Sequence, residues 1–487
     1  MKLYIYTIIS ALLLFSSCND FLDKYPENTV DIQEVDYTKT EDMFKPAAGI
    51  YARVRSNNGF GSWSAYGLIA VRGDDIDKGS SPADQGDLTN AENFNYSQLG
   101  GYWALNGTWQ GLYNLVLNSN AALIALDEYN KYTTTDAEKK LNAQYHAEVR
   151  FMRAYAYFYL VRLFGDIPLV VDNETVLTNS LKTSRADIYK FINDEITFCV
   201  ANLPALRPNE MPYKGQVTMY TALALKAKAN SDINDWDAVL SATNEIINSG
   251  KFSLYSSFYD YFKLPGCLSN ENLFELQYAV IDGTVFASDA WFEFQGPRNG
   301  FVGDKIGGGW GFLTPSPKFE ALFKSRGESD RFETTFLFAG TITREGDELK
   351  PSIAPEGYDR VFNGKTYLPS TQLPVGKTTY GLGNNIRMLR YADVLLLNAE
   401  AKVRKGQNGD TPFNEVRTRA KMTNLTNVTL DQILEERSIE LAGEWGERFY
   451  DLVRTGKAEG TLNGFVAGKS EFYPVPQAQI DLNPNLR

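Results

Sequence analysis

The chain has 487 residues, and its 60 acidic residues outnumber 48 Lys and Arg residues, which gives a formal net charge of −12. This balance argues against a nucleic-acid-binding protein, because a surface that follows phosphates needs an excess of Lys and Arg. The single histidine, His146, excludes a multi-histidine metal site, and three cysteines are too few for a disulfide framework.

The N-terminus has the pattern of a lipoprotein signal peptide. Lys2 precedes an apolar segment from Leu3 to Phe15, which is too short to span a bilayer, and two serines then lead to Cys18. We expect a signal peptide over residues 1–17 and lipid on Cys18, which would anchor the protein to a membrane without a spanning helix. The alternative is that Cys18 is the first residue after an ordinary secretory cleavage.

The first clear helix is predicted between Leu141 and Phe164. Apolar residues recur there on one stripe with arginines off it, and Gly165 is expected to end the helix. His146 lies within this segment among alanines and a glutamate, so we interpret it as an ordinary helix residue rather than as a catalytic base.

Three more helices are predicted to start near Ser184, Val217 and Asp235. Ser184 can cap its helix, and Cys199 lies at apolar spacing within it, which favours a core position. The step from Ser184 to Val217 is close to the repeat length of tetratricopeptide helix pairs. The sequence therefore predicts a degenerate array of such pairs.

Long irregular segments interrupt this helical texture. Residues 263–385 are rich in Gly, Pro, Thr and aromatic residues without helical period, which is too long for a simple loop, so we expect an inserted loop-rich region. Residues 59–109 have a similar texture. We predict a mainly α fold: one domain over residues 18–487, with a tetratricopeptide-like scaffold at about 110–262 and 386–456.

Six of the seven tryptophans fall into two groups. Trp103, Trp291 and Trp310 lie in irregular texture, and an indole beside polar side chains suits a sugar ring, which has an apolar face and a hydroxyl rim. The alternative is that each indole fills a small core beneath its loop. A second set lies in or beside predicted helices and is expected in the core: Trp109, Trp236 and Trp445.

An acidic loop begins at Asp74. Asp75, Asp77 and Gly79 resemble the start of a calcium-binding loop, but Gly86 stands where the twelfth-position glutamate belongs, so a solvated acidic loop is favoured and no metal is expected. Arg72 and Asp74, at the start of the loop, are candidates for hydrogen bonds to a polar ligand.

No sequence pattern predicts catalysis. A glycoside hydrolase needs only two carboxyl groups, but 60 acidic residues make chance pairs common, and none is singled out. The glycine-rich stretch "GGGWG" lacks the lysine and helix of a phosphate-binding loop, and no cofactor is expected. The residues favour a binding protein over an enzyme.

Five blocks resemble the SusD/RagB family of outer-membrane nutrient-binding lipoproteins. They are "CNDFLDKYP", "VRFMRAYAYFYLVRLFGDIPLV", "RYADVLLLNAEAKVRKG", "EERSIELAGEWGERFYDLVRTG" and "FYPVPQAQIDLNPNL", which extend in the family's order from Cys18 to nearly the last residue. The resemblance implies a lipid-anchored protein on the cell surface of the outer membrane of Bacteroidetes. It also implies a scaffold of four tetratricopeptide-like pairs and no enzymatic activity.

The resemblance also implies partners and ligand residues. Members of the family cover a SusC-like TonB-dependent transporter and capture oligosaccharides, or in some members peptides, for import. Trp103 with Asn106, and Trp310 before "TPSP", match the ligand-binding pattern of the starch-binding member, while Trp291 and Arg72 match less closely.

Three functions therefore remain open from the sequence. The favoured function is a surface glycan-binding protein that serves a transporter, with a peptide-binding member of the same family as a variant. A surface glycoside hydrolase is the second, and a helical adaptor that binds another protein is the third.

Overall fold

The computed structural model describes residues 35–56, 59–174, 177–281, 284–286, 290–298, 308–352, 357–374 and 383–487. The predicted signal peptide at 1–17 and the predicted lipidation site Cys18 lie outside the described residues. No helix in the described ranges combines the length and the apolar character needed to cross a membrane.

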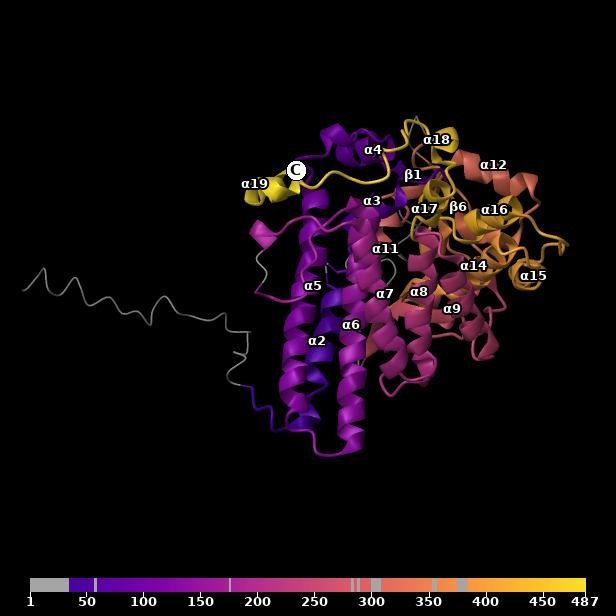
Figure 1. Ribbon diagram of the computed structural model, residues 1–487. Helices are drawn as coiled ribbons and strands as arrows, with labels where there is room; N and C mark the ends of the chain where they lie inside the picture. Colours follow the sequence, from indigo (N-terminus) through magenta and orange to yellow (C-terminus); the bar gives the residue numbers. More distant parts are fainter. Residues whose placement is uncertain are drawn as a thin grey trace, which may run out of the picture.

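The first half of the molecule is an array of antiparallel helices (Figure 1). Two long helices, α5 and α6, pack side by side with α2 against both, and each later helix packs on the one before it. The bounds are α2 (Lys45–Val54), α5 (Trp103–Asn130), α6 (Asp136–Phe164), α7 (Arg185–Asn202), α8 (Met219–Asp232) and α9 (Trp236–Asn248).

The ends of these helices follow from local sequence. Helix α6 begins before the predicted stretch, because Thr135 and Glu138 form a capping box there, and it ends at Gly165, whose φ of 73° favours glycine. The Ser184 side chain accepts a hydrogen bond from the backbone N–H of Asp187, which confirms the predicted cap of α7.

The array continues in space across a long stretch of sequence. Helix α14 packs against α9 although a loop-rich segment separates them in the chain, and α14 then contacts α15 and α16. The bounds are α14 (Tyr391–Arg404), α15 (Asp410–Arg419), α16 (Leu430–Glu440) and α17 (Glu447–Arg454). The predicted mainly α fold of packed helical pairs is confirmed.

Short elements make up the segments around the array. In the described residues the strands form two-stranded antiparallel sheets, pairing β1 with β5, β2 with β8, β3 with β4 and β6 with β7. The strands are β1 (Ile76–Gly79), β2 (Asn272–Leu276), β3 (Ala279–Ile281), β4 (Thr284–Phe286), β5 (Phe312–Pro315), β6 (Phe336–Phe338), β7 (Val361–Asn363) and β8 (Ile386–Arg390). The short helices are α3 (Trp63–Ala70), α4 (Gly86–Glu92), α10 (Phe258–Tyr261), α11 (Trp291–Gln295), α12 (Pro317–Ser325), α13 (Asp330–Thr335), α18 (Ala458–Thr461) and α19 (Gln477–Leu482).

The loop-rich segment leaves and rejoins the array at one place. Strand β2 lies near its start and β8 at its end, and they pair with Asn272 opposite Arg390 and Leu276 opposite Ile386. Both strands are buried throughout. The two ends of the segment are therefore fixed to each other as well as to the helices.

Buried ion pairs join this segment to the late helices. The Arg390 guanidinium lies 2.7 Å from Glu271 and 3.1 Å from Glu440, and Arg419 lies 3.0 Å from Glu271, with each of these side chains at most 3% exposed. A second buried group, formed by Arg162, Asp232, Glu447, Lys228, Asp393, Arg437 and Asp451, ties α6 and α8 to α14, α16 and α17.

Four residues were predicted to lie in the core, and the structure buries three of them. Trp109 and Trp445 are buried, and so is Cys199, within α7. Trp236 is partly buried at the first residue of α9, with the Arg404 guanidinium 4.4 Å from the centre of its ring.

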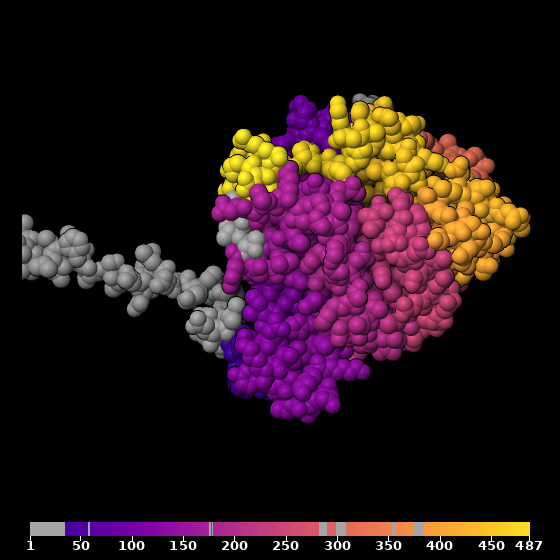
Figure 2. All heavy atoms as spheres, in the orientation of Figure 1, coloured from indigo at the N-terminus to yellow at the C-terminus, as the bar shows by residue number. Residues whose placement is uncertain are grey.

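The C-terminal segment crosses one end of the long helices. Figure 2 shows it in yellow, running over the upper face of the molecule from α17 and α18 to α19. The backbone N–H of Tyr473 donates to the Leu163 carbonyl, and that of Gln477 donates to the Gly100 carbonyl. This segment fixes the start of α5 and the end of α6, beside which the candidate site lies.

Candidate functional site

Three tryptophans meet at the surface where α3 and α5 begin. The Trp63 ring is central: its centroid lies 5.5 Å from that of Trp103, 5.2 Å from that of Trp310 and 4.9 Å from that of Phe294. Trp103 is 53% exposed and Trp310 is 38% exposed, whereas Trp63 is partly buried beneath them. We call Trp63, Trp103 and Trp310 the tryptophan surface.

Trp63 and Trp103 are positioned by helices, and Trp310 by a backbone hydrogen bond just before a strand. Trp63 and Trp103 are the first residues of α3 and α5, so Trp103 is helical rather than part of a loop as its texture indicated. The Trp310 N–H donates to the Glu293 carbonyl at 2.7 Å, and β5, which follows, pairs with β1. The surface thus joins residues that are more than 200 positions apart in sequence.

A cleft of about 430 Å³ opens beside Trp63 and Trp310. Its polar wall contains an ion pair, with the Arg298 guanidinium 2.7 Å from the Asp84 carboxylate. Ser80 donates to the same carboxylate at 2.8 Å, and these hydrogen bonds from Arg298 and Ser80 hold the pKa of Asp84 below its usual value. The lining residues are Trp63, Asp84, Gln85, Arg298, Gly309, Trp310 and Phe312.

This arrangement combines apolar ring faces with fixed hydrogen-bonding groups. Ligand sites commonly have such a composition, with mostly apolar walls and a few polar groups that set orientation. Asp84 supplies an ionised acceptor, Arg298 supplies donors, and the Gln85 amide oxygen accepts from the Tyr102 hydroxyl at 3.2 Å. A flat ligand with a polar rim would be complementary to both components.

Asn106, which the family resemblance paired with Trp103, lies one turn after it on α5. It is half-buried, and its amide oxygen accepts a hydrogen bond from Gln479 in α19 at 2.8 Å. The structure therefore places Asn106 beside the tryptophan surface and links it to the C-terminal segment.

Trp291 does not join the tryptophan surface. It is 7% exposed, and its ring centroid lies 5.0 Å from that of Tyr66 and 6.1 Å from that of Trp445. Its Nε1 is buried and has no hydrogen-bond partner among the residues that the structure describes. An indole enclosed in this way has no face available for stacking on a sugar.

Arg72 is also placed in the interior. It is 1% exposed, its guanidinium carbon lies 4.1 Å from the centre of the Phe449 ring, and it donates to the Tyr450 hydroxyl at 2.7 Å. Asp74 accepts from the Arg448 guanidinium at 2.7 Å and from the Lys318 ammonium at 2.5 Å. Both side chains therefore hold α17 to the acidic loop, away from the tryptophan surface.

The acidic loop differs from a calcium-binding loop. Asp75 is buried and accepts from the Gly443 N–H at 3.2 Å, and burial raises its pKa to about 6. The Lys78 ammonium donates to the carbonyls of Ser81 and Asp84 at 2.9 and 2.7 Å, so a protein cation occupies the loop. Within the described ranges no three acidic, His or Cys side chains are grouped as metal ligands.

Three residues of the site were missed in the sequence: Trp63, Asp84 and Arg298. Trp63 stands in "FGSWSAYG", which has the glycine-flanked texture that drew attention to Trp103 and Trp310, so the same criterion would have found it. Asp84 belongs to the acidic loop that was interpreted as solvated. Nothing local marks Arg298, because its partner Asp84 is distant in sequence.

Two family models match the chain. One, described as the SusD family, matches residues 270–470, and the other, described as starch-binding associating with outer membrane, matches residues 20–229. The chain belongs to the SusD family. A SusD-like protein of Bacteroides ovatus is 25% identical over 93% of this chain and 82% of its own length.

Solved structures of this family share the fold. A laminarin-binding SusD-like protein superposes with a TM-score of 0.77 at 23% identity, covering 91% of this chain and 97% of the other. Surface glycan-binding protein A from Bacteroides thetaiotaomicron, solved in complex with laminarihexaose, gives a TM-score of 0.75 at 23% identity, covering 92% and 98% of the two chains. At this identity the similarity establishes the helical fold of the SusD family for the chain.

Proposed function

We propose that this protein binds an oligosaccharide or polysaccharide on the tryptophan surface. The observation that carries the proposal is the meeting of three indoles beside a cleft with an ionised Asp84 and its partner Arg298. Indole faces stack on the C–H face of a sugar ring, while charged groups satisfy the hydroxyls that lose water. The glycan ligands named for two solved relatives support the same ligand class.

The residues proposed to contact the glycan differ from those expected from the sequence. Trp103 and Trp310 remain in the proposal, and Asn106 lies at its edge. Trp63, Asp84 and Arg298 are added. Trp291, Arg72 and Asp74 are left out, because their side chains are engaged in the interior.

We further propose that the chain is held on the outer membrane by lipid on Cys18, faces outward, and delivers its glycan to a SusC-like TonB-dependent transporter. The family description, starch-binding associating with outer membrane, supports this location. A Cys18→Ala variant is expected to leave the membrane fraction while keeping its fold, since each acyl CH₂ contributes about 0.8 kcal/mol to anchoring. Continued pelleting in high salt, in cells that lack the transporter, would contradict the proposal.

We infer that the protein binds glycans without cleaving them. A glycosidase needs one protonated carboxyl group in addition to an ionised one. Among the described residues that line the cleft, Asp84 is the one with a carboxyl group. Hydrogen bonds from Arg298 and Ser80 lower its pKa, so it does not serve as the protonated group. Incubation with a bound polysaccharide should release no new reducing ends.

The central experiment is a glycan array that includes laminarin and starch, followed by calorimetry on the best ligand. The Trp103→Ala/Trp310→Ala double variant should lose binding while melting at the wild-type temperature. Tyr132→Ala is the matched control, because Tyr132 is 48% exposed just beyond the opposite end of α5. Equal loss in the control, or full binding by the double variant, would place the site elsewhere.

A further inference from the structure

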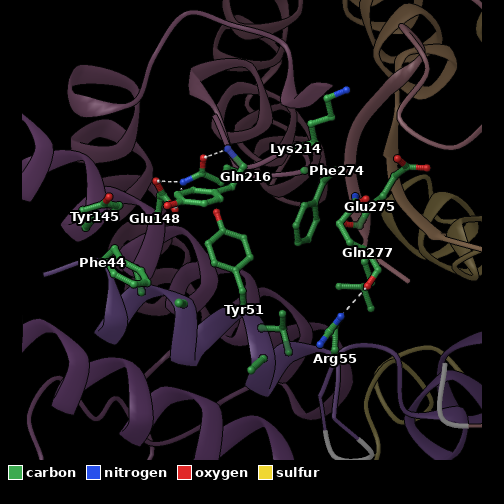
Figure 3. Close-up of a pocket in the computed structure, with 17 residues that line it drawn as sticks. Phe44, Tyr51, Arg55, Tyr145, Glu148, Lys214, Gln216, Phe274, Glu275 and Gln277 are labelled. Carbon is green, nitrogen blue, oxygen red and sulfur yellow. Dashed lines mark hydrogen bonds between the residues drawn. The ribbon is translucent and has the colours of Figure 1, made fainter. Parts of the chain in front are cut away.

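A second pocket lies on the helical scaffold, built from other elements than the tryptophan surface. It has a volume of about 340 Å³ and opens between α2, α6, the loop before α8 and the end of β2. Figure 3 shows its side chains converging from these elements. None of the residues that line it lines the cleft at the tryptophan surface.

Aromatic rings and small side chains form most of its wall. Phe44 directly precedes α2, Tyr51 lies in α2, Tyr145 comes from α6 and Phe274 from β2. Their rings surround the space in Figure 3. The α2 wall also contains Ala47, Ala48, Ala52 and Val54. Arg55, which follows the helix, donates to the Gln277 carbonyl at 3.1 Å. Ala48 is exposed, so the pocket reaches the surface along this helix.

Glu148 and Glu275 are buried carboxyl groups in this wall, and Glu275 is paired with Arg387. Glu148 differs from it. It is 1% exposed, its carboxylate accepts from the Gln144 and Gln216 amides at 2.9 and 3.1 Å, and the Tyr51 hydroxyl also bonds to it. Burial raises its pKa to about 7. No ion pair joins it to any Lys, Arg or His in the described part of the chain, unlike Glu271 or Glu440.

A buried carboxylate without an ion pair favours a cationic ligand. The three donors around Glu148 are neutral groups, one of which reaches both carboxylate oxygens, so they supply hydrogen bonds but no compensating charge. A buried charge is strongly stabilised by a counter-ion, and a cation is also attracted to the faces of surrounding aromatic rings. Lys214, which lines the pocket, is exposed and extends away from Glu148 in Figure 3, so it does not supply that charge.

We propose that this pocket binds a small organic cation, an ammonium group on an apolar body, with the ammonium against the Glu148 carboxylate and the body among the rings of Phe44, Tyr51, Tyr145 and Phe274. The site is separate from the glycan proposal and does not depend on it. Neutral compounds of the same shape lack the ionic contact, and carboxylates are repelled by Glu148.

The test uses three probes of one shape with the lipid-free chain from residue 19 onward. 2-Phenylethylammonium carries the cation, 2-phenylethanol is the neutral analogue, and 3-phenylpropionate is the anion. Calorimetry at pH 8 should show binding of the ammonium, at least about tenfold weaker binding of the alcohol, and no binding of the carboxylate. Equal affinity for the ammonium and the alcohol, or no binding of the ammonium, would overturn the proposal.

Two variants localise the effect. Glu148→Gln keeps the shape and should weaken ammonium binding about 10- to 100-fold, while leaving the alcohol unchanged. Ala48→Phe, at an exposed position of α2, should obstruct the pocket for both probes, and Arg53→Ala on the same helix is its control. If Glu148→Gln failed to fold, the loss in Ala48→Phe against full binding in Arg53→Ala would support the site. Unchanged binding in Ala48→Phe would refute it.

Discussion

The charged interior and the tryptophan surface follow opposite rules. In the interior, carboxylates such as Glu440 are buried and paired with arginines. Glu440 and its partner Arg390 both belong to the sequence blocks that resemble the family. At the tryptophan surface, apolar rings are exposed and lie in segments outside those blocks. The blocks therefore contain residues that stabilise the fold. The residues that we propose to determine ligand preference lie elsewhere, and the family resemblance identified only some of them.

The largest expected effect comes from breaking the charged interior. Arg390→Met removes the cation shared by Glu271, Glu440 and Glu444, which should lower the free energy of unfolding by about 3–5 kcal/mol. The remaining partners, Arg419 and Lys365, then compensate these buried carboxylates only in part. Chemical denaturation followed by circular dichroism measures it. The exposed pair Lys190–Asp194 is the control, and Lys190→Met should change little. A similar small change for both variants would contradict this account of the interior.

The second effect separates a buried tryptophan from an exposed one. Trp291→Ala creates a cavity against Tyr66 and Trp445, so we expect the free energy of unfolding to fall by about 3 kcal/mol. Glycan affinity, measured on the folded fraction, should stay near wild type. A variant that melts normally but binds glycan poorly would return Trp291 to the binding site.

The third effect concerns the exposed indoles one at a time. Trp103→Ala and Trp310→Ala should each weaken glycan binding by about 2 kcal/mol, which is between tenfold and a hundredfold in Kd. Neither should shift the melting temperature as Trp291→Ala does, because both rings are substantially exposed. Calorimetry and thermal melts on the same samples give both quantities. An early melt in either variant would show that its ring supports the fold.

The smallest effect contrasts an unpaired carboxyl group with a paired one. Burial raises the pKa of Glu148 to about 7, so its ionisation disfavours the folded state and stability falls as pH rises from about 4.5 to 7. For Glu440, burial alone would raise the pKa, but Arg419 and Arg390 hold it at about 2, so its contribution is lost only as pH falls from about 4.5 toward 2. We therefore compare the free energy of unfolding of Glu148→Gln with that of the wild type. The difference in favour of the variant should be about 1–2 kcal/mol larger at pH 8 than at pH 5. Denaturation at the two pH values measures it, and a pH-independent difference would contradict the assignment.

Local sequence predicted what depends on local interactions. The cap at Ser184 and the stop at Gly165 involve neighbours within a few residues, and the core position of Trp109 follows from helical spacing. Trp103 and Trp291 have similar surroundings in sequence, yet one is exposed and the other enclosed. The difference comes from Tyr66 and Trp445, which reach Trp291 from distant parts of the chain.

Arg72 illustrates the same limit for a charged residue. Its position just before an acidic loop suggested a ligand-binding group. The structure instead buries it against the Tyr450 hydroxyl and the Tyr473 ring, which lie near the other end of the chain. Arg298 and Asp84 form their ion pair over a separation of 214 positions. No pattern of period or spacing carries such pairings, so the polar half of the site had to come from the structure.

The pairing of β2 with β8 has a consequence for how ligand preference can change. Because the two strands fix both ends of the loop-rich segment, exposed residues between Leu276 and Ile386 can be exchanged while α9 stays packed on α14. Trp291 and Arg331 are exceptions, because they are buried against partners outside the segment. Such an exchange would replace Trp310 and Arg298 but keep Trp63, Trp103 and Asp84. The wall of the cleft that contains Trp310 and Arg298 can therefore change in sequence, while the wall that contains Trp63 and Asp84 stays the same.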